Sequence, residues 1–192
     1  MVDAWTEWGL LAICPKGGSF IEYNGSIDRD SLEITQGTKD FDIIQLLNGG
    51  CLEKPNPEGE YVMSFDIYFT DLDTTDNSGI LQLFHTTKAN WDTTGPLSVT
   101  NSRNRDQFKV VVLFTEDTTV TSADSAITNK AACRFILTNA RFVEATPVSF
   151  GDGILKVTCK FKAAPYTKAG AGNFTVESAT SSDSLDAVPT FS

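Results

Sequence analysis

Alternation between apolar and polar side chains is the sequence feature that most limits how this chain can fold. Residues 154–163 show it most clearly, because one face is apolar and the other carries mostly lysine. The apolar face consists of Leu155, Val157, Cys159 and Phe161, and the polar face of Lys156, Thr158, Lys160 and Lys162. A period of two is the side-chain repeat of a β-strand. The pattern therefore predicts a half-buried antiparallel strand.

Similar patterns predict further strands along the chain. Tyr61–Phe69 and Phe108–Phe114 are the strongest, since each is rich in the aromatic and β-branched residues that favour strands. The apolar face of the first is expected to consist of Tyr61, Met63, Phe65, Ile67 and Phe69. A buried strand is also expected at Trp8–Cys14, and Phe150–Gly153 is interpreted as the turn before residues 154–163. The remaining strand candidates are Ser19–Tyr23, Leu32–Gln36, Cys133–Thr138 and Arg141–Thr146. With no internal repeat or break in composition, residues 1–192 are expected to form one mainly-β domain.

One short helix is predicted inside this β-rich chain, at Gly79–Thr86. Asp76, Asn77 and Ser78 precede it and are candidate N-caps. A helix of this length is not stable alone, so it must dock on a sheet. The docking side consists of Ile80, Leu81 and Phe84.

The segments between the strands are unusually long, and one of them is apolar. Residues 37–60 contain a cluster of large hydrophobic side chains, whereas Thr86–Asp106 and the last residues of the chain are mostly polar. Loops longer than about 12–15 residues are uncommon in compact domains unless they are functional or disordered. The cluster consists of Phe41, Ile43, Ile44, Leu46 and Leu47. A lone domain would struggle to bury it, which indicates burial against another subunit.

The acidic composition argues against nucleic-acid binding. The formal net charge is −10 and the sequence pI is near 4.5, whereas phosphate neutralisation requires clustered lysine and arginine. The row formed by Lys156, Lys160 and Lys162 is interpreted as a solvated sheet face, or one paired with a neighbouring subunit. No apolar run reaches the roughly 20 residues of a membrane helix, so no membrane partner is expected.

No residue pattern predicts catalysis or a cofactor. His85 is the only histidine, and no nucleophile motif accompanies it. Asp71–Asp76 has oxygen ligands at alternate positions but fails the EF-hand pattern, so a polar loop is the favoured interpretation over a calcium site. The expectation is a non-enzymatic protein without metal or cofactor. The four cysteines, expected to be buried small hydrophobes without a disulfide or zinc, are Cys14, Cys51, Cys133 and Cys159.

A resemblance to a known family enters near the C-terminus. The stretch from Arg134-Phe135 through Ser149-Phe150-Gly151-Asp152-Gly153 to Lys160-Phe161-Lys162-Ala163 resembles the C-terminal hairpin of major tail tube proteins of long-tailed phages and archaeal viruses. Gly170-Ala171-Gly172-Asn173-Phe174-Thr175 is similar as well. As an order of elements the resemblance covers residues 20–178, and as recognisable residues 133–176.

The resemblance implies a fold and an assembly. Such proteins fold as two packed antiparallel sheets with one flanking helix, a tail-tube-like sandwich or half-barrel. Six subunits form a ring, and rings stack around a tape-measure protein. Residues 37–60 correspond to the long loop that contacts the next ring. Residues 165–192 correspond to a C-terminal arm on a neighbouring subunit, whose contact residues are expected to be Tyr166, Phe174 and Val176.

The expected function follows from this resemblance. The chain would be a structural subunit of a viral tail tube, located in the virion tail and assembled in the host cytoplasm. Its other partners would be tail terminator and baseplate proteins. Genomic DNA would pass through an acidic lumen without specific binding, because like charges repel.

Other interpretations remain open at this stage. Contractile injection systems and tail-like bacteriocins use related tube proteins. A β-sandwich module that binds carbohydrate or a cell surface is a candidate from another class, with Trp91 as an exposed platform and Asp71–Asp76 as a calcium loop. An enzyme ranks last for want of a plausible site.

The apolar loop provides a first test. Deletion of Phe41–Leu47 is expected to leave the domain folded and to abolish stacking, because the deleted side chains serve a contact between subunits. Electron microscopy and circular dichroism measure the two effects. Tubes of normal length from the deletion variant would contradict the assignment of this loop.

Overall fold

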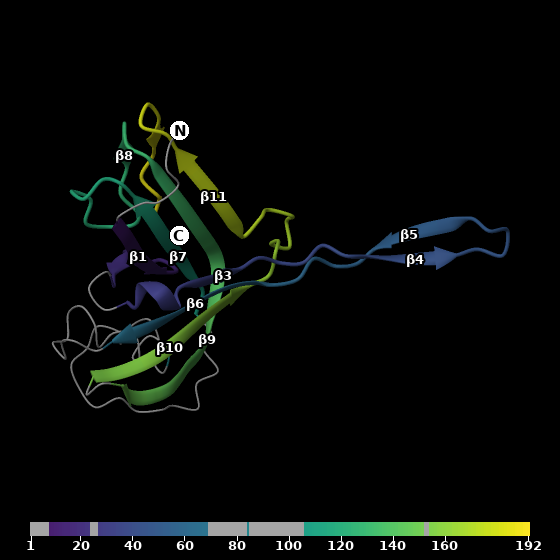
Figure 1. Ribbon diagram of the computed structural model, residues 1–192, viewed down its shortest axis with the longest axis horizontal. Coiled ribbons are helices and arrows are strands. Elements are labelled where there is room, and N and C mark those ends of the chain that lie inside the picture. Colours follow the sequence, from purple (N-terminus) through teal and green to yellow (C-terminus); the bar gives the residue numbers. More distant parts are fainter. Residues whose placement is uncertain (1–7, 24–26, 69–83, 85–105, 152–153) are drawn as a thin grey trace.

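The computed structural model describes residues 8–23, 27–68, 84, 106–151 and 154–192 (Figure 1). Antiparallel β-strands dominate this part of the chain, as the alternating patterns predict. The strands are β1 (Trp8–Pro15), β2 (Ile21–Glu22), β3 (Glu33–Thr35), β4 (Phe41–Gln45), β5 (Cys51–Pro55), β6 (Tyr61–Tyr68), β7 (Phe108–Thr115), β8 (Ile127–Thr128), β9 (Ala132–Gly151), β10 (Ile154–Ala163), β11 (Phe174–Ala179) and β12 (Ser184–Leu185). A single 3-10 turn, η1 (Arg29–Ser31), precedes β3.

The main sheet folds over on itself to make two packed halves. Its strand order is β2-β1-β7-β9-β10-β6-β3, and β11 pairs with β9 as well. The first part of β9 pairs with β7 and β11, and its last part pairs with β10. One 20-residue strand thus belongs to both halves. The expected architecture of two packed antiparallel sheets is confirmed, with this continuous strand as the connection.

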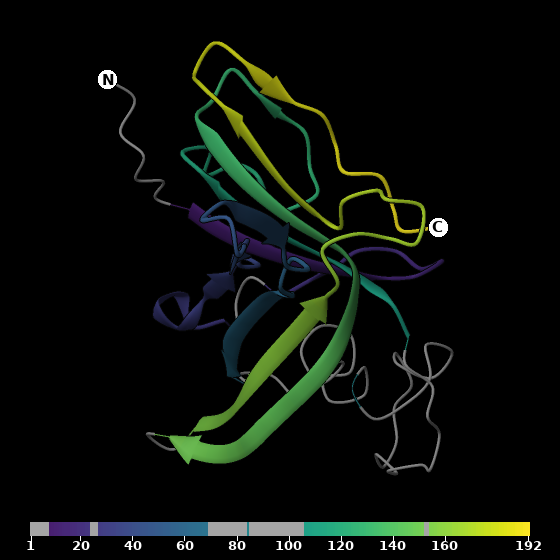
Figure 2. The ribbon, with the colours of Figure 1, turned by 90° about the vertical axis from the view of Figure 1, so that its right-hand side faces the viewer.

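The bend in β9 corrects one expectation from the sequence. Cys133–Thr138 and Arg141–Thr146 were expected as separate strands, but they are two parts of β9. Asn139 lies between them with a φ of 54°, in the left-handed region that asparagine tolerates better than most residues. The pairing with β7 shifts at the same place, between Phe108 and Val110. Figure 2 shows β9 turning there from one half-sheet into the other, as sheet corners often do.

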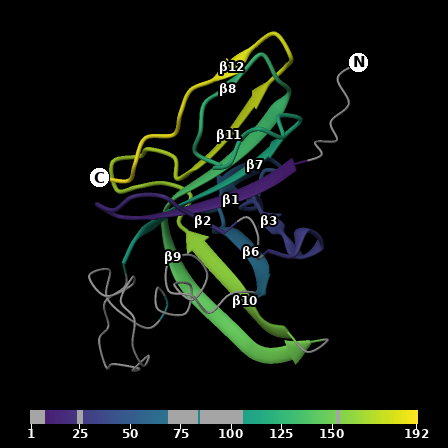
Figure 3. The same ribbon diagram turned by 90° about the vertical axis from the view of Figure 1, so that its left-hand side faces the viewer.

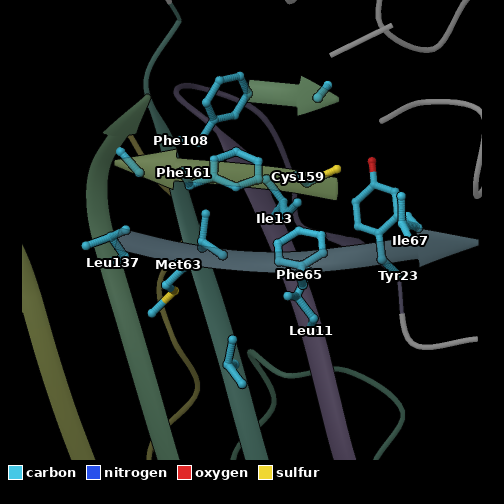
Figure 4. Packing of buried hydrophobic residues seen from close by; sticks show 14 of the residues in the cluster. Leu11, Ile13, Tyr23, Met63, Phe65, Ile67, Phe108, Leu137, Cys159 and Phe161 are labelled. Carbon is cyan, nitrogen blue, oxygen red and sulfur yellow. The ribbon is translucent and has the colours of Figure 1, made fainter. Parts of the chain in front are cut away.

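The main core lies between the two half-sheets. Phe161 is at its centre, with ring centroids 6.0 Å from Phe65, 5.8 Å from Phe108 and 4.3 Å from Phe142. Figure 4 shows the Phe161 ring among its neighbours from β6 and the Phe108 end of β7. The apolar faces predicted for β6 and β10 supply Met63, Phe65, Ile67, Val157, Cys159 and Phe161, which are all buried. Burial raises the pKa of the Cys159 thiol to about 12.

A second core lies on the outer face of β1 and β7. Val110 and Val112 point into the main core, whereas Val111 and Leu113 belong to the second cluster. Because both faces of β7 are apolar, both need a cover. The C-terminal residues provide the outer one, since Ala179, Leu185 and Val188 join this cluster. Figure 3 shows the C-terminal segment running beside β8 and β11 to end near β1.

This cover changes the interpretation of residues 165–192. The segment was expected to be an arm on a neighbouring subunit, but the structure packs it on its own domain. Residues Phe174–Ala179 form β11 on β9, and the Lys109 ammonium donates to the Pro189 carbonyl over 2.8 Å. The Phe191 amide lies 3.4 Å from the Cys14 sulfur. The chain end is thus an integral part of the fold.

Buried Arg134 ties this segment to β9. Its side chain, 1% exposed, donates to the carbonyl oxygens of Ser125 and Asp186 over 3.0 and 2.5 Å. It also contacts the Glu177 carboxylate on β11, with an N···O distance of 2.6 Å. A buried guanidinium is tolerated only when its donors are satisfied. Arg134 therefore holds three segments in one arrangement.

The structure also bears on the expected helix, on residues 37–60 and on the cysteines. Ile80 and Leu81 lie outside the described residues, whereas Phe84 has a helical backbone and packs edge-to-face on Phe142 at 5.0 Å. Residues 37–60 are not an irregular loop, because they contain the hairpin β4–β5. Cys51 is exposed on that hairpin, contrary to the expectation that it would be buried, while Cys14 and Cys159 are buried.

The contacts of Arg134 generate a stability prediction. Arg134→Met is expected to lower the free energy of unfolding by about 3 kcal/mol, because two carbonyl oxygens and a carboxylate lose their buried donor. Urea unfolding at neutral pH measures the change. The matched control is Lys168→Met at an exposed position, expected to change the value by about 0.5 kcal/mol or less. Equal effects of the two substitutions would contradict the role of Arg134.

Candidate assembly interface

The hairpin β4–β5 stands away from the body of the protein (Figure 1). Its turn is closed by the Leu46 amide, which donates to the Gly50 carbonyl over 2.8 Å, and by the Gly49 amide, which donates to the Leu46 carbonyl over 2.9 Å. Gly49 has a φ of 80°, a conformation that glycine adopts without strain. All ten residues of the two strands are exposed.

The register of the hairpin places apolar side chains on both of its faces. Ile43 lies opposite Glu53 and Ile44 opposite Leu52, and successive residues of a strand point to opposite faces. The face of Ile43 also carries Phe41, and Phe41, Ile43 and Leu52 are each more than 50% exposed. A monomer rarely leaves so many neighbouring apolar side chains uncovered. The hairpin is therefore suited to burial on both faces by other molecules.

A close backbone crossing holds the base of the hairpin. The Gly59 amide donates to the Thr38 carbonyl over 3.1 Å, and the Asn56 amide donates to the Asp40 carbonyl over 2.9 Å. A Cβ atom on Gly37 would lie 2.3 Å from the Gly59 oxygen. The two backbone segments can approach this closely only because residue 37 is glycine.

A carboxylate joins the hairpin base to the loop after β10. Glu58 accepts a hydrogen bond from the Tyr61 hydroxyl and another from the Tyr166 hydroxyl, each over 2.5 Å. Lys39 lies 4.0 Å away. The Tyr166 and Tyr61 hydrogen bonds, in that order, lower the pKa of Glu58. These contacts attach the hairpin to the domain at a defined angle.

The residues expected to contact a neighbour from the C-terminal arm have different surroundings. Tyr166 is half exposed and bonded to Glu58. Phe174 stacks on Tyr61 with ring centroids 4.8 Å apart, so it serves the chain's own core. Val176 on β11 is half exposed. Contacts of these residues with another subunit stay a prediction.

The lysine row of β10 is paired within the chain. Lys156 forms an ion pair with Asp66 on β6, Lys160 with Glu144 on β9 over 3.0 Å, and Lys162 with Glu60 over 2.5 Å. These carboxylates offset the positive charge of the row. The row was interpreted as solvated or paired with a neighbouring subunit, whereas the structure pairs it with carboxylates of the same chain.

A pocket of about 260 Å³ lies beside β1, and no sequence motif indicated it. Its lining is apolar apart from Arg29. Trp8 on its rim is 41% exposed, and β2 pairs with β1 only at Ala12 and Ile13. The lining includes Trp8, Gly9, Arg29, Leu32 and Phe114. They come from separate parts of the chain, which explains why no local pattern reveals the pocket.

The sequence did contain a signal for the hairpin. Asn48-Gly49 between apolar segments is a strong hairpin signal, and it predicts that Cys51 and Leu52 belong to the exposed ribbon. Within the described ranges, no three His, Cys, Asp or Glu residues gather into a possible metal site. His85, Trp91 and Asp71–Asp76 lie outside those ranges. No helix in the described part of the chain is long and apolar enough to cross a membrane.

The Glu58 contacts predict that the stability of the hairpin base depends on pH. The folded state lowers the Glu58 pKa below its ordinary 4.5. The hydrogen bonds to the ionised Glu58 carboxylate therefore stabilise the hairpin base at neutral pH. That contribution is lost as the pH falls through the lowered pKa. Tyr166→Phe is expected to raise the Glu58 pKa, measured from side-chain carboxyl shifts by NMR. The pKa of Glu144, lowered by Lys160, is the internal control. An unchanged Glu58 pKa would contradict the proposed effect of the Tyr166 hydrogen bond.

The chain is similar to known proteins in its fold and not in its sequence. No protein-family model and no curated protein sequence matches the chain. A chain of the sheath–tube complex of PVC, an extracellular contractile injection system, is similar with a TM-score of 0.50 at 9% identity, over 93% of each chain. A chain of the anti-feeding prophage baseplate has a TM-score of 0.49 at 11% identity, over 92% of this chain and 97% of that one. With its packed antiparallel sheets, the protein has a tube-protein fold.

Proposed function

We propose that the chain is a structural subunit of the tube of a phage-like contractile injection system, with no catalytic role. The observation that carries the proposal is the exposed hairpin β4–β5, which is apolar on both faces. The tube-protein fold supports it, and the similar PVC chain comes from a complex of sheath and tube.

Assembly with copies of itself is the simplest way to cover the hairpin. One copy has its hairpin at one end only, so a contact between the hairpin and another surface of a second copy is head-to-tail. Such contacts close into rings or continue as helical filaments. Rings that stack through their hairpins would form a tube, with terminator, cap and baseplate proteins as partners at its ends.

The charge distribution is compatible with a channel. The chain has a net charge of −10, and the lysines of β10 are paired with carboxylates. A surface with excess negative charge repels polyanions and does not retain them. The passage of cargo through the lumen without adhesion is part of this proposal.

The tail tube of a tailed virus is the second candidate. It is favoured by the resemblance of residues 133–176 to major tail tube proteins, and it would add a tape-measure protein and genomic DNA as partners. The two candidates differ in location, which is an extracellular particle for the injection system and a virion tail for the virus. The surface-binding alternative depended on Trp91 and Asp71–Asp76, outside the described residues.

Electron microscopy of the purified protein tests the proposal. Negative-stain images are taken after concentration and incubation at several salt concentrations. Hollow rods or stacked rings are expected. A protein that stays monomeric under all these conditions would contradict the proposal.

The two faces of the hairpin generate a more specific prediction. Ile43→Asp and Ile44→Asp are each expected to reduce the assembled fraction at least about tenfold, because each buries a charge on a different apolar face. Sedimentation velocity measures the fraction. The melting temperature of the monomer is expected to stay unchanged, since both positions are exposed.

The matched control for these variants is Ala169→Asp, which adds the same charge at an exposed position outside the hairpin. Near-normal assembly of this variant is expected. Normal assembly of either isoleucine variant would show that its face stays uncovered.

A further inference from the structure

We propose that the hairpin tip of one copy seats in the apolar pocket beside β1 of the next copy. This inference rests on the proposed function and specifies its head-to-tail contact. It assigns a receiving site on the body of the protein to the exposed leucines of the turn.

The tip is an apolar group that its own chain leaves uncovered. Leu47 is fully exposed, and Leu46 beside it is 39% exposed. The main-chain hydrogen bonds between Leu46 and Gly50 hold both residues in a closed turn. The tip is therefore preorganised, which reduces the entropy lost on binding.

The pocket matches the tip in size and chemistry. An apolar cavity of about 150 Å³ accommodates a benzene molecule, so the pocket of about 260 Å³ has room for roughly two leucine-sized side chains. Leu32 and Phe114 line it, and Trp8 on the rim is 41% exposed. Partly exposed tryptophans beside apolar pockets are common centres of binding energy at interfaces.

The positions of tip and pocket favour a repeating contact. Along the longest axis, the hairpin projects from one end of the molecule and β1 with η1 lies toward the other (Figure 1). Figure 2, which looks along that axis, shows the hairpin in front of part of β1. A shift along the axis thus brings the tip of one copy toward the pocket of the next. Each copy then offers one tip and one pocket, so the contact can repeat without limit.

Apolar complementarity identifies a second copy as the occupant. The exposed leucines of the tip are apolar, and the pocket lining is apolar apart from Arg29. An apolar tip on one copy therefore matches an apolar pocket on the next.

A pocket-filling variant tests this contact. A Cβ atom on Gly9 would meet only the Phe114 ring, at 3.5 and 3.6 Å, which is ordinary contact. Gly9→Leu is therefore expected to fold, occupy the pocket and reduce the assembled fraction at least about tenfold by sedimentation velocity. Gly172→Leu is the matched control, because a Cβ there has only the Phe174 oxygen nearby, at 3.9 Å. Its assembly is expected to stay within about twofold of wild type.

Cross-linking between different copies provides the second measurement. Asn48→Cys, beside the tip leucines, and Asp30→Cys, at an exposed position beside Arg29, are made as separate variants in a Cys51→Ser background, mixed, and treated with a short bismaleimide. Covalent pairs of one variant with the other are expected, in at least tenfold excess over a mixture of Asn48→Cys with Lys168→Cys.

The outcomes separate this inference from the proposed function. Wild-type tubes together with normal assembly of Gly9→Leu, or with no excess of cross-linked pairs, would overturn the docking site and leave the tube function standing. A wild-type protein that never assembles would overturn both.

Discussion

The whole structure depends on the central strands β1 and β7, which are apolar on both faces. In β7, Val110 and Val112 point into the core between the half-sheets, whereas Val111 and Leu113 point the other way. Exposing either set to water would cost the hydrophobic free energy of several side chains, so the chain must supply two covers. The second part of β9 and its partners provide one, and the C-terminal segment provides the other. The bend at Asn139 and the burial of Arg134 are consequences of placing these covers.

The hairpin β4–β5 differs from the body of the protein in that its apolar side chains are exposed. The body buries its large apolar side chains on both sides of the central strands, whereas the hairpin exposes Phe41, Ile43 and Leu52. The glycine crossing at Gly37 and the hydrogen bonds to Glu58 fix the base of the hairpin, so its exposed faces are presented in a defined direction. An exposed apolar ribbon that is attached at its base suits a subunit whose apolar surface is completed by its neighbours.

Much of the β architecture could be predicted from local patterns, and the long-range features could not. The apolar faces of β6 and β10 were predicted residue by residue, because a two-residue period reports a half-buried strand directly. The composition of residues 37–60 indicates an apolar cluster that a lone domain does not bury, and the Asn48-Gly49 pair inside it is a local signal for the hairpin turn. The packing of the C-terminal segment on its own domain was not expected, because its polar composition conceals the few buried contacts of Leu185, Val188 and Phe191. The pocket beside β1 has no local signal, since its lining joins segments far apart in sequence.

The sequence by itself determined the strand content, the faces of the strongest strands and the presence of an apolar segment that the domain does not cover. These properties follow from side-chain periodicity and composition, which act over a few residues. Tertiary structure alone decided that one strand bends into both half-sheets, that the chain end covers its own sheet, and that tip and pocket lie toward opposite ends of the molecule. These outcomes depend on which distant segments bury one another, and patterns that act over a few residues do not specify that choice.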